Sequence, residues 1–597
     1  MNSGVVVRLI GRPQIERGGE CVVLPRGRKS WAVLAYVALA ELPVTRERLA
    51  SLLFADAADP LGALRWTLAE LRRSLGATDS LRGDPLRLDL PAGLVVDALE
   101  LGRGRAKPEF VRGGLLEGIE LDAGPVFDAW LLVERRRLGG LCEGVLRDAA
   151  LAALAVGRAR DAAGLASRAL EFSPFEEGLH ELLVRCLAAS GDVGAARHAA
   201  VSCEVLFRRE LGRSPDRSVA RAADPAEQFG ALGDRAAALG QLQAGVAAID
   251  AGAVEPGIAC LRMACAEARA LGDDAVLARV LIEFGIALVH AVRGRDEEGA
   301  AMLHEALALA ESLGESELVV AACRELGYVE VQAGRAASAG RWLARASADA
   351  GEDRQRAKVL GVRGMALSDR AYYVAAIGLL TESVAAAERC GDRRQVAWSL
   401  AILGRARLLR GELDTAAEVL DRSLGLIDDE GWVAFQPFPE ALRAEVALRE
   451  GAIEEAEGLA GHAFALGCQL GDPCWEGFGA RAMGLFYRSR GEHEAGLECL
   501  RDAVARAGRV ADPYVWVKAY CLDALAAYLI DHGREADAIA VVSDLGTLAA
   551  RGDMRELVVR AAMHSARLGD RSALDAVRPL AESIDSPALY AELALVV

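Results

Sequence analysis

The sequence lacks the short motifs by which many nucleotide-using and hydrolytic enzymes are recognised. It has no GxxxxGKS/T phosphate loop, no GxSxG or HExxH signature, no kinase motif set and no dinucleotide fingerprint. Its Asp and Glu residues lie mostly on expected helices, where a solvated helix face explains them more simply than a catalytic role. We therefore expect a protein that is not an enzyme and that uses no cofactor.

Paired cysteines and membrane-spanning segments are also lacking. The 12 cysteines form no CxxC pair, as expected of small apolar side chains in a reducing compartment. Cys468 and Cys474 lie close together, with His462 nearby, and this spacing does not favour a metal site. No uncharged apolar run reaches membrane-spanning length, and the first residues do not resemble a signal peptide. We expect a cytoplasmic protein with no membrane partner.

Positive charge is scarce overall but unevenly distributed. The net charge is −17, which by itself argues against a phosphate-bearing partner. Residues 1–105, however, carry 15 Lys+Arg against 12 Asp+Glu, whereas the remainder carries 54 against 74. A mildly basic head before an acidic body suits a head that reads DNA and a body that does not adhere to it. At 597 residues, several domains or a repeat array are expected.

The best-marked element is a helix between Asp59 and Gly76. Asp59 can cap its first N–H groups, Pro60 suits the first helical position, and Gly76 suits the left-handed residue that ends a helix. A leucine stripe at helical spacing is expected to be buried: Leu61, Leu64, Leu68, Leu71 and Leu75. The outer face is then expected to hold Arg65, Trp66, Thr67, Glu70, Arg72 and Arg73. Such side chains can contact base edges and phosphates, although a solvated amphipathic helix is the plainer alternative.

The neighbouring segments favour DNA recognition. β-branched runs at 5–10 and 21–24 flank Gly18-Gly19 and predict a hairpin. Helices are expected from Arg28 to Ala40 and from the Thr45 cap to Phe54. Residues 81–97, with turns at 83–85 and 91–93, predict a second hairpin. Three helices followed by a hairpin form a winged helix, in which the third helix enters the major groove. Arg82 and Arg87 are the candidate wing contacts, or simply charged residues on a strand edge.

The run RKSWAVLAYVAL, PVTRERLASLLF and LRWTLAELRRSLG resembles the winged-helix domain of the bacterial antibiotic-regulatory activator proteins. Residues 113–215, from GGLLEGIELDAGPVFDAWLLVERRRL to the segment ending in LFRRELGRSP, are similar to the transcriptional activation domain that follows in that family. The resemblance implies sequence-specific DNA binding, recruitment of RNA polymerase, and two copies bound to promoter direct repeats about one helical turn apart.

The segment that resembles the activation domain also has a helical-repeat spacing. Gly157 and Gly191 lie 34 residues apart, as do Ala162 and Ala196, which matches the period of tetratricopeptide helix pairs. The Pro-containing stretch that follows predicts a linker.

The rest of the chain repeats every 40 residues or so. One series of turn positions comprises Gly252, Gly294, Gly334, Arg370, Gly411, Gly451, Gly491 and Gly533, and a second comprises Gly272, Gly314, Gly351, Gly391, Gly431, Gly471, Ala511 and Gly552. Each unit is therefore expected to be two antiparallel helices. Small residues are expected at the close contacts between those helices: Gly327, Gly364, Gly404 and Gly484 before the turns, and Ala300, Ala416, Ala456 and Ala495 after them.

A solenoid of this kind has a concave surface that suits a peptide, a protein or a small effector. Trp398, Trp432, Phe435, Phe438, Trp475, Tyr487 and Trp516 are possible lining residues, although such aromatics more often pack between helices. In GWVAFQPFPE two prolines are expected to interrupt a helix beside Trp432, Phe435 and Phe438, which would mark an insertion on the binding face.

The predicted fold is therefore mainly α, with an N-terminal winged helix-turn-helix and a tetratricopeptide-type solenoid. The predicted domains are a winged helix (1–105), an activation domain (106–215), a linker (216–230), a repeat array (231–570) and capping helices (571–597). The favoured function is a DNA-binding regulator in which Arg65, Trp66, Thr67 and Glu70 read bases while Arg72, Arg73, Arg82 and Arg28 hold the backbone. The alternative is a tetratricopeptide scaffold whose winged helix binds protein instead of DNA.

Overall fold

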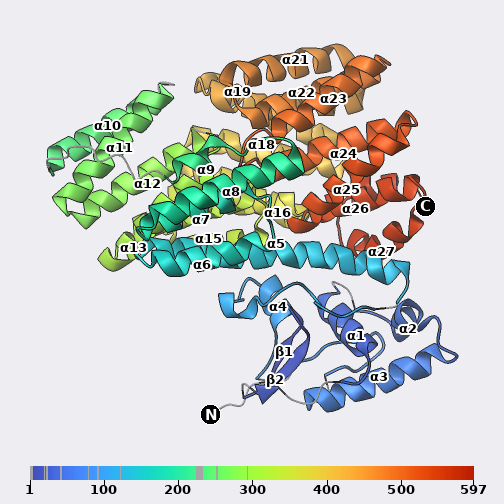
Figure 1. The fold of residues 1–597 in the computed structure, drawn as a ribbon. Helices are drawn as coiled ribbons and strands as arrows, with labels where there is room; N and C mark the ends of the chain where they lie inside the picture. The colour runs from blue at the N-terminus through green and yellow to red at the C-terminus, as the bar shows by residue number, and fades with distance from the viewer. Residues whose placement is uncertain are drawn as a thin grey trace. The chain divides into compact units, whose positions relative to one another are not determined.

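The structure is a computed structural model of the chain, drawn with its element labels in Figure 1. It describes residues 5–18, 20–21, 25–40, 43–77, 80–90, 93–121, 123–223, 233–250, 253–291 and 293–596. The chain forms two compact units. The first comprises residues 1–145, 529–585 and 589–597, and the second comprises residues 146–528 and 586–588.

The first unit opens with a four-stranded sheet. Its strands are β1 (Val5–Arg8), β2 (Gln14–Arg17), β3 (Glu20–Cys21) and β4 (Leu94–Val96), in the order β3-β2-β1-β4. β1 pairs with β2 in antiparallel fashion, with Val7 opposite Ile15, and both side chains are fully buried. The predicted pairing of 5–10 with 21–24 is therefore wrong: the turn that joins β1 to its partner lies at Gly11, and Gly18 joins β2 to β3. Gly19 and residues 22–24 lie outside the described residues.

Three helices follow, as predicted: α1 (Arg28–Leu39), α2 (Arg46–Phe54) and α3 (Pro60–Leu75). The Thr45 side chain caps α2 by accepting the N–H of Arg48 at 3.3 Å. Buried side chains of α1, among them Trp31, Leu34 and Ala35, form much of the core against the other two helices.

The predicted hairpin over residues 81–97 is only partly present. Arg82 and Arg87 form a single antiparallel bridge around Gly83, and Leu86 bridges to Val44. β4 follows this turn in the chain and pairs in parallel with β1, with Val96 opposite Val7. Val96 is almost fully buried there, so burial against β1 outweighs the local pairing that the sequence suggested. Residues 91 and 92 of the second predicted turn lie outside the described residues.

Helices then dominate the chain. They begin with α4 (Asp97–Gly102), the short η1 (Pro108–Phe110), α5 (Pro125–Ala155), α6 (Ala159–Leu170), α7 (Glu177–Ala189), α8 (Val193–Leu211) and α9 (Arg217–Arg221). Gly157 and Gly191 both have positive φ values at the turns before α6 and α8, and Ala162 and Ala196 are fully buried. The 34-residue spacing therefore corresponds to a helix pair, as predicted.

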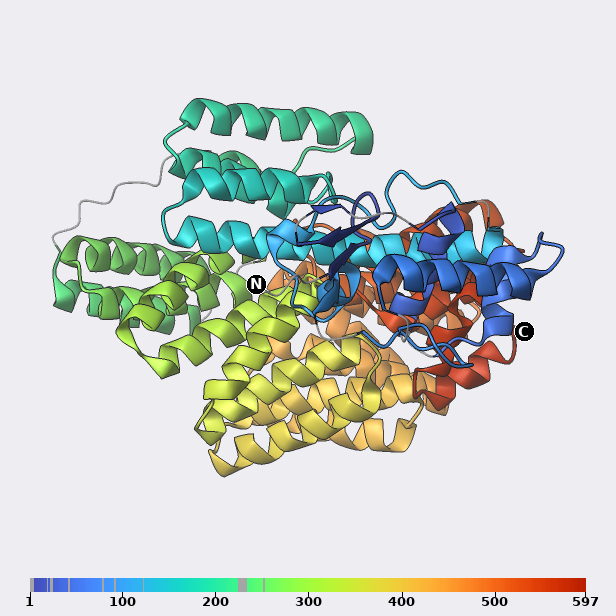
Figure 2. The same cartoon turned by 90° about the horizontal axis from the view of Figure 1, so that it is seen from below.

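The repeat array is built from consecutive helices that lie side by side in pairs (Figure 2). Their bounds are α10 (Arg235–Asp250), α11 (Val254–Leu271), α12 (Asp274–His290), α13 (Asp296–Leu313), α14 (Ser316–Gln332), α15 (Ala336–Asp349), α16 (Asp353–Asp369), α17 (Tyr373–Arg389), α18 (Arg393–Arg410), α19 (Leu413–Asp429), η2 (Val433–Phe435), α20 (Pro437–Glu450), α21 (Ile453–Leu470), α22 (Pro473–Ser489), α23 (His493–Ala507), α24 (Val515–Asp531), α25 (Glu535–Arg551), α26 (Arg555–Arg567), α27 (Arg571–Glu582) and α28 (Pro587–Leu593). The predicted mainly α fold with a tetratricopeptide-like solenoid of helix pairs is confirmed.

Most predicted turn glycines end a helix in the left-handed conformation, but four positions of the two series differ. At the fourth position of the first series Ala371 has the positive φ, and at the last position of the second series Asp553 has it, each one residue after the predicted position. Ala511 has no positive φ. Gly351 ends no helix in this way, since α15 ends in extended backbone at Ala350. Gly252 lies outside the described residues.

Small residues bring neighbouring helices together as predicted. A Cβ atom added at Gly404 would lie 2.5 Å from Cγ of Leu420, and Gly364 meets Leu380 in the same way. Only glycine fits there, because real Cβ contacts are longer. One predicted alanine is misplaced: Ala495 is only partly buried, and Gly496 holds the close contact, since a Cβ atom added there would lie 3.3 Å from the Gly484 carbonyl oxygen.

The two compact units do not follow the predicted domains. One hydrophobic core in the second unit joins Leu151 of α5, Leu182 of α7 and Ile258 of α11, on both sides of the predicted linker. Residues 529–585 belong instead to the unit that holds the N-terminal helices. Sequence order alone therefore does not separate the packed bodies.

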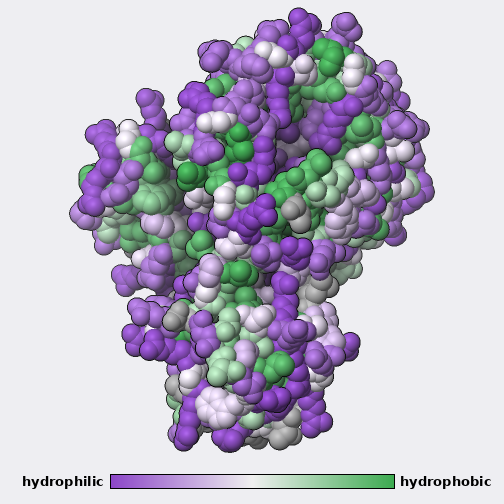
Figure 3. All heavy atoms as spheres, turned by 90° about the vertical axis from the view of Figure 1, so that its right-hand side faces the viewer, coloured by the Kyte–Doolittle hydropathy of each residue, from purple (hydrophilic) through white to green (hydrophobic). Residues whose placement is uncertain are grey.

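On the face drawn in Figure 3, hydrophilic side chains cover most of the surface and hydrophobic ones form scattered patches. Among the helices described, none is long and apolar enough to cross a membrane. The described His, Cys, Asp and Glu residues form no group of three suited to a metal ion.

Candidate nucleic-acid interface

The helix α3 provides the frame of the candidate interface. Asp59 Oδ1 accepts the N–H of Gly62 at 2.8 Å, Pro60 occupies the first turn, and Gly76 ends the helix with φ 67°. Leu64, Leu68, Leu71 and Leu75 are buried as predicted, but Leu61 is 44% exposed. Leu61 lies in the first turn of α3, about one turn before Leu64, which is the first buried leucine of the helix.

Arg65, Trp66 and Arg73 lie on the exposed face of α3. The side chains of Arg65 and Arg73 are 66% and 74% exposed, and Trp66 is 54% exposed. Arg65 contacts Asp59 at 3.4 Å, a surface ion pair that contributes little. These three side chains are therefore available to a partner, as predicted.

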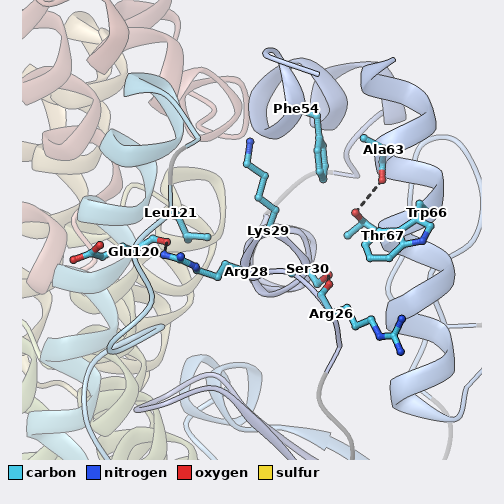
Figure 4. A pocket seen from close by; sticks show the side chains of 11 residues that line it. Arg26, Arg28, Lys29, Ser30, Phe54, Ala63, Trp66, Thr67, Glu120 and Leu121 are labelled. Carbon is cyan, nitrogen blue, oxygen red and sulfur yellow. Dashed lines mark hydrogen bonds between the residues drawn. The ribbon is translucent and has the colours of Figure 1, made fainter. Parts of the chain in front are cut away.

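Thr67 and Glu70 lie elsewhere, which contradicts their predicted place on the exposed face. Thr67 is 3% exposed and its hydroxyl donates to the Ala63 carbonyl at 2.9 Å (Figure 4). Glu70 is 7% exposed, and it accepts from Nη1 of Arg73 at 2.5 Å and from the backbone N–H of Arg26 at 3.4 Å. At 100° per residue both positions fall on the flank that faces the start of α1, so neither side chain is presented to a base.

A cluster of arginines lies where α3, α2 and the 82–87 turn meet. Arg72 is half-buried, and its guanidinium donates to the Leu81 carbonyl. Burial, then the nearby Arg46 and Arg82, lower the pKa of Arg72. Arg46 Nε donates to the Gly83 carbonyl at 2.9 Å, so three guanidinium groups converge beside the turn. An anion placed among them would relieve their mutual repulsion, which suits a phosphate.

Arg46 is a candidate contact that the sequence reasoning missed. It occupies the first position of α2, directly after the Thr45 cap, and its own backbone N–H donates to Asp84 Oδ1 at 3.0 Å. Its position at the start of a helix could have identified it, because a cation and the free N–H groups at a helix start both favour an anion. Arg87 is exposed on the other side of the turn, where its N–H donates to the Arg82 carbonyl at 3.0 Å.

A cleft of about 490 Å³ opens beside Trp66, between the start of α1 and α3 (Figure 4). Its cationic lining comes from Arg26, Arg28 and Lys29, and Phe54 contributes an apolar wall. The Lys29 ammonium lies 5.5 Å from the Phe54 ring centre. Arg28 is exposed and donates to the Glu120 carbonyl at 3.3 Å. Cations beside apolar walls suit a sugar–phosphate chain better than a free ion in water.

The aromatic segment predicted to line the repeat array belongs to its core. Phe435 and Phe438 are buried, and Phe438 stacks on Phe478 with ring centres 5.4 Å apart. Trp432 is half-buried and stacks on Phe435 at 4.8 Å. Pro437 starts α20 and does not interrupt a helix, because proline suits the first turn. The predicted insertion on a binding face is therefore absent here.

Comparison with known proteins identifies one domain. A family model for the bacterial transcriptional activator domain matches residues 97–224. No curated protein matches the chain significantly.

Several solved structures are similar to this chain at low sequence identity. A Rap protein complexed with Competence and Sporulation Factor is 14% identical over 53% of this chain and 88% of its own, with a TM-score of 0.44. Mycobacterium tuberculosis EmbR, in complex with a low affinity phosphopeptide, is 19% identical over 37% and 64%, with a TM-score of 0.28. Yeast Tom70 is 13% identical over 75% and 93%, with a TM-score of 0.30. At this level these likenesses concern the fold alone. Residues 97–224 thus carry a bacterial transcriptional activator domain, which indicates a transcription regulator.

Proposed function

We propose that the protein is a sequence-specific DNA-binding transcription regulator, with a winged-helix head, an activator domain that recruits RNA polymerase, and a repeat array that senses an effector. The observation that carries the proposal is the exposed cationic face of α3, with Arg65, Trp66 and Arg73, beside the cluster of Arg46, Arg72 and Arg82. The activator domain directly follows this head.

In this proposal the side chains divide by what they contact. Arg65 and Trp66 meet base edges in the major groove, since they are the exposed side chains nearest the start and middle of α3. Arg72, Arg73, Arg82, Arg46 and Arg28 hold the phosphate backbone. Two copies would occupy direct repeats in a promoter. The acidic body keeps the rest of the chain off the DNA, because like charges repel.

The repeat array is the proposed sensor. Its occupant would be a peptide, a protein or a small effector in the cytoplasm, and no catalytic step is assigned to it. The aromatic residues at 432–438 are not its contacts, because they pack inside the array.

The test is binding of the full chain to DNA from its own upstream region and neighbouring promoters, across a salt series. The double variant Arg72→Ala/Arg73→Ala is compared with Arg103→Ala, an arginine of the same unit that pairs with Glu100 at 3.3 Å. We expect the double variant to lose specific binding and to show a smaller salt dependence, while Arg103→Ala retains both.

A scaffold that uses the head to bind protein is the second candidate. Its support is the repeat array itself, an architecture suited to binding other proteins. If selection from random DNA yields no site for the full chain, the scaffold takes the place of the regulator.

A further inference from the structure

A second cleft in the first unit lies away from α3. Its volume is about 180 Å³, and α1, the segment before α2, α5 and α27 line it. Its apolar lining includes Tyr36, Leu39, Val44, Trp130, Val577 and Pro579. All of these residues belong to the one compact unit. The cleft therefore joins two helices of the head to a helix some 530 residues later in the chain.

One wall of this cleft is aromatic. The rings of Tyr36 and Trp130 lie 4.6 Å apart and are tilted by 51°, and Phe127 lies 5.2 Å behind Trp130. Aromatic pairs prefer such tilted or offset arrangements over a face-to-face sandwich. A flat ring placed in the cleft would extend this cluster, whereas a chain-like molecule would leave much of the ring surface uncovered.

The opposite wall has an unusual backbone feature. Pro579 lies inside α27 and lines the cleft. Proline has no N–H, so the carbonyl of Asp575, four residues earlier, receives no hydrogen bond from position 579. Asp575 does not line the cleft, and the acceptors that a molecule with an N–H or O–H group would meet there are the carboxylates of Glu134 and Glu582.

The charged residues that line the cleft are Arg48, Glu134 and Glu582. Glu134 already accepts from Arg137 Nη2 at 2.7 Å, which leaves one cation and one carboxylate of opposite sign. A neutral molecule therefore fits better than an acid or an amine, either of which would meet a like charge.

We propose that this cleft binds a small neutral aromatic molecule with one N–H or O–H donor, of the size of phenol or indole. The volume suits such a ring, because an apolar cavity of about 150 Å³ holds benzene. The occupant would hold α27 against α1 and the start of α2, and so would act on the head from a site separate from the DNA-facing side of α3. The proposal does not depend on DNA binding.

Isothermal titration calorimetry of the full chain with phenol and indole tests the proposal directly. Toluene matches phenol in size but has no donor, and benzoate and benzylamine add a charge of either sign. We expect phenol and indole to bind at least tenfold more tightly than the other three. Absence of phenol and indole binding would overturn the site, and equal binding of toluene or tighter binding of benzoate would overturn the assigned chemistry.

Two variants locate the binding in the cleft. Ala576→Leu fills it from α27 and is expected to abolish binding, while Ala573→Leu, on the same helix but outside the lining, is expected to retain it. Retained binding in Ala576→Leu would overturn the location. Circular dichroism checks that this variant folds. If it does not fold, Leu580→Ala tests the location instead, because it enlarges the cleft. We expect the ratio of 2-naphthol affinity to phenol affinity to rise at least fivefold over that of the wild type. An unchanged ratio would overturn the location.

Discussion

Arg147 of α5 is almost fully buried, and its Nε donates to Glu297 Oε1 of α13 at 2.7 Å. The same guanidinium also donates to Glu330 of α14, so one side chain of the activator domain is held by two carboxylates of the repeat array. Arg335 Nε reaches the other oxygen of Glu330 at 2.9 Å. The activator domain and the array thus share a desolvated ionic network as well as a hydrophobic core. A change in the conformation of α13 or α14 would therefore act directly on α5.

Replacing Arg147 tests the energetic weight of this network. Arg147→Met removes one of the two cations beside the buried Glu297 and Glu330 and leaves only Arg335 there, which should lower the free energy of unfolding by about 3–5 kcal/mol. Arg158→Met is the control, because Arg158 is exposed and its pair with Asp161 is long, at 3.9 Å; we expect a change within about 0.5 kcal/mol. Urea unfolding followed by circular dichroism measures both. Equal effects of the two variants would contradict the buried pair.

The glycine contacts of the repeats give a prediction of steric origin. Gly404→Ala places a Cβ atom 2.5 Å from Leu420, so we expect a loss of about 1–3 kcal/mol as the helices move apart. Gly425→Ala on the next helix is the matched control. Nothing lies within 4 Å of its added Cβ, and alanine favours a helix over glycine by about 0.5–1 kcal/mol. Thermal melts should therefore move in opposite directions, and a stabilised Gly404→Ala would contradict the packing.

The helix ends and the glycine contacts are the parts of the fold that the sequence predicts well. Asp59, Pro60 and Gly76 fix the ends of α3 because caps act within a turn of the chain, and the glycine periodicity reports a local helix pair. Thr67 and Glu70 were misplaced because the flank they occupy is covered by α1, which no local pattern encodes. The pairing of β4 with β1 depends on residues about 90 positions apart. The contact between the rings of Tyr36 and Trp130 could likewise not be predicted, because the two residues lie on separate helices.

The buried carboxylates of the second unit predict how stability depends on pH. Burial and then the neighbouring Glu297 raise the pKa of Asp296 to about 7, although Arg293, Arg335 and Arg147 oppose the shift. The pKa of Asp512, whose carboxylate accepts the Asp296 N–H at 2.6 Å, is also raised by burial. The folded state therefore keeps protons that the unfolded state releases above the usual Asp pKa of about 4. The contribution of these two carboxylates to stability should therefore fall as the pH rises from about 4 to about 7.

Asp296→Asn removes one of these titrating groups. We expect the urea midpoint of the variant to depend less steeply on pH between about 4.5 and 7 than that of the wild type, since less proton release accompanies its unfolding. Asp512→Asn should reduce the slope in the same direction. A pH dependence unchanged in Asp296→Asn would show that this buried carboxylate stays ionised in the folded state.

The positions of Thr67 and Arg65 on α3 predict opposite results in DNA binding. Thr67 donates its hydroxyl to the Ala63 carbonyl and is buried, whereas Arg65 is exposed. Thr67→Val should leave affinity and sequence preference within about twofold of the wild type, because it removes only a hydroxyl that faces its own helix. Arg65→Ala should lose about 1–3 kcal/mol on the preferred site and less on random DNA, as expected of a side chain at a base edge. Fluorescence anisotropy with both DNAs measures the difference, with Arg103→Ala as the control for lost charge. If Thr67→Val relaxed the sequence preference while Arg65→Ala did not, the flank of α3 that now packs toward α1 would have to turn outward on DNA.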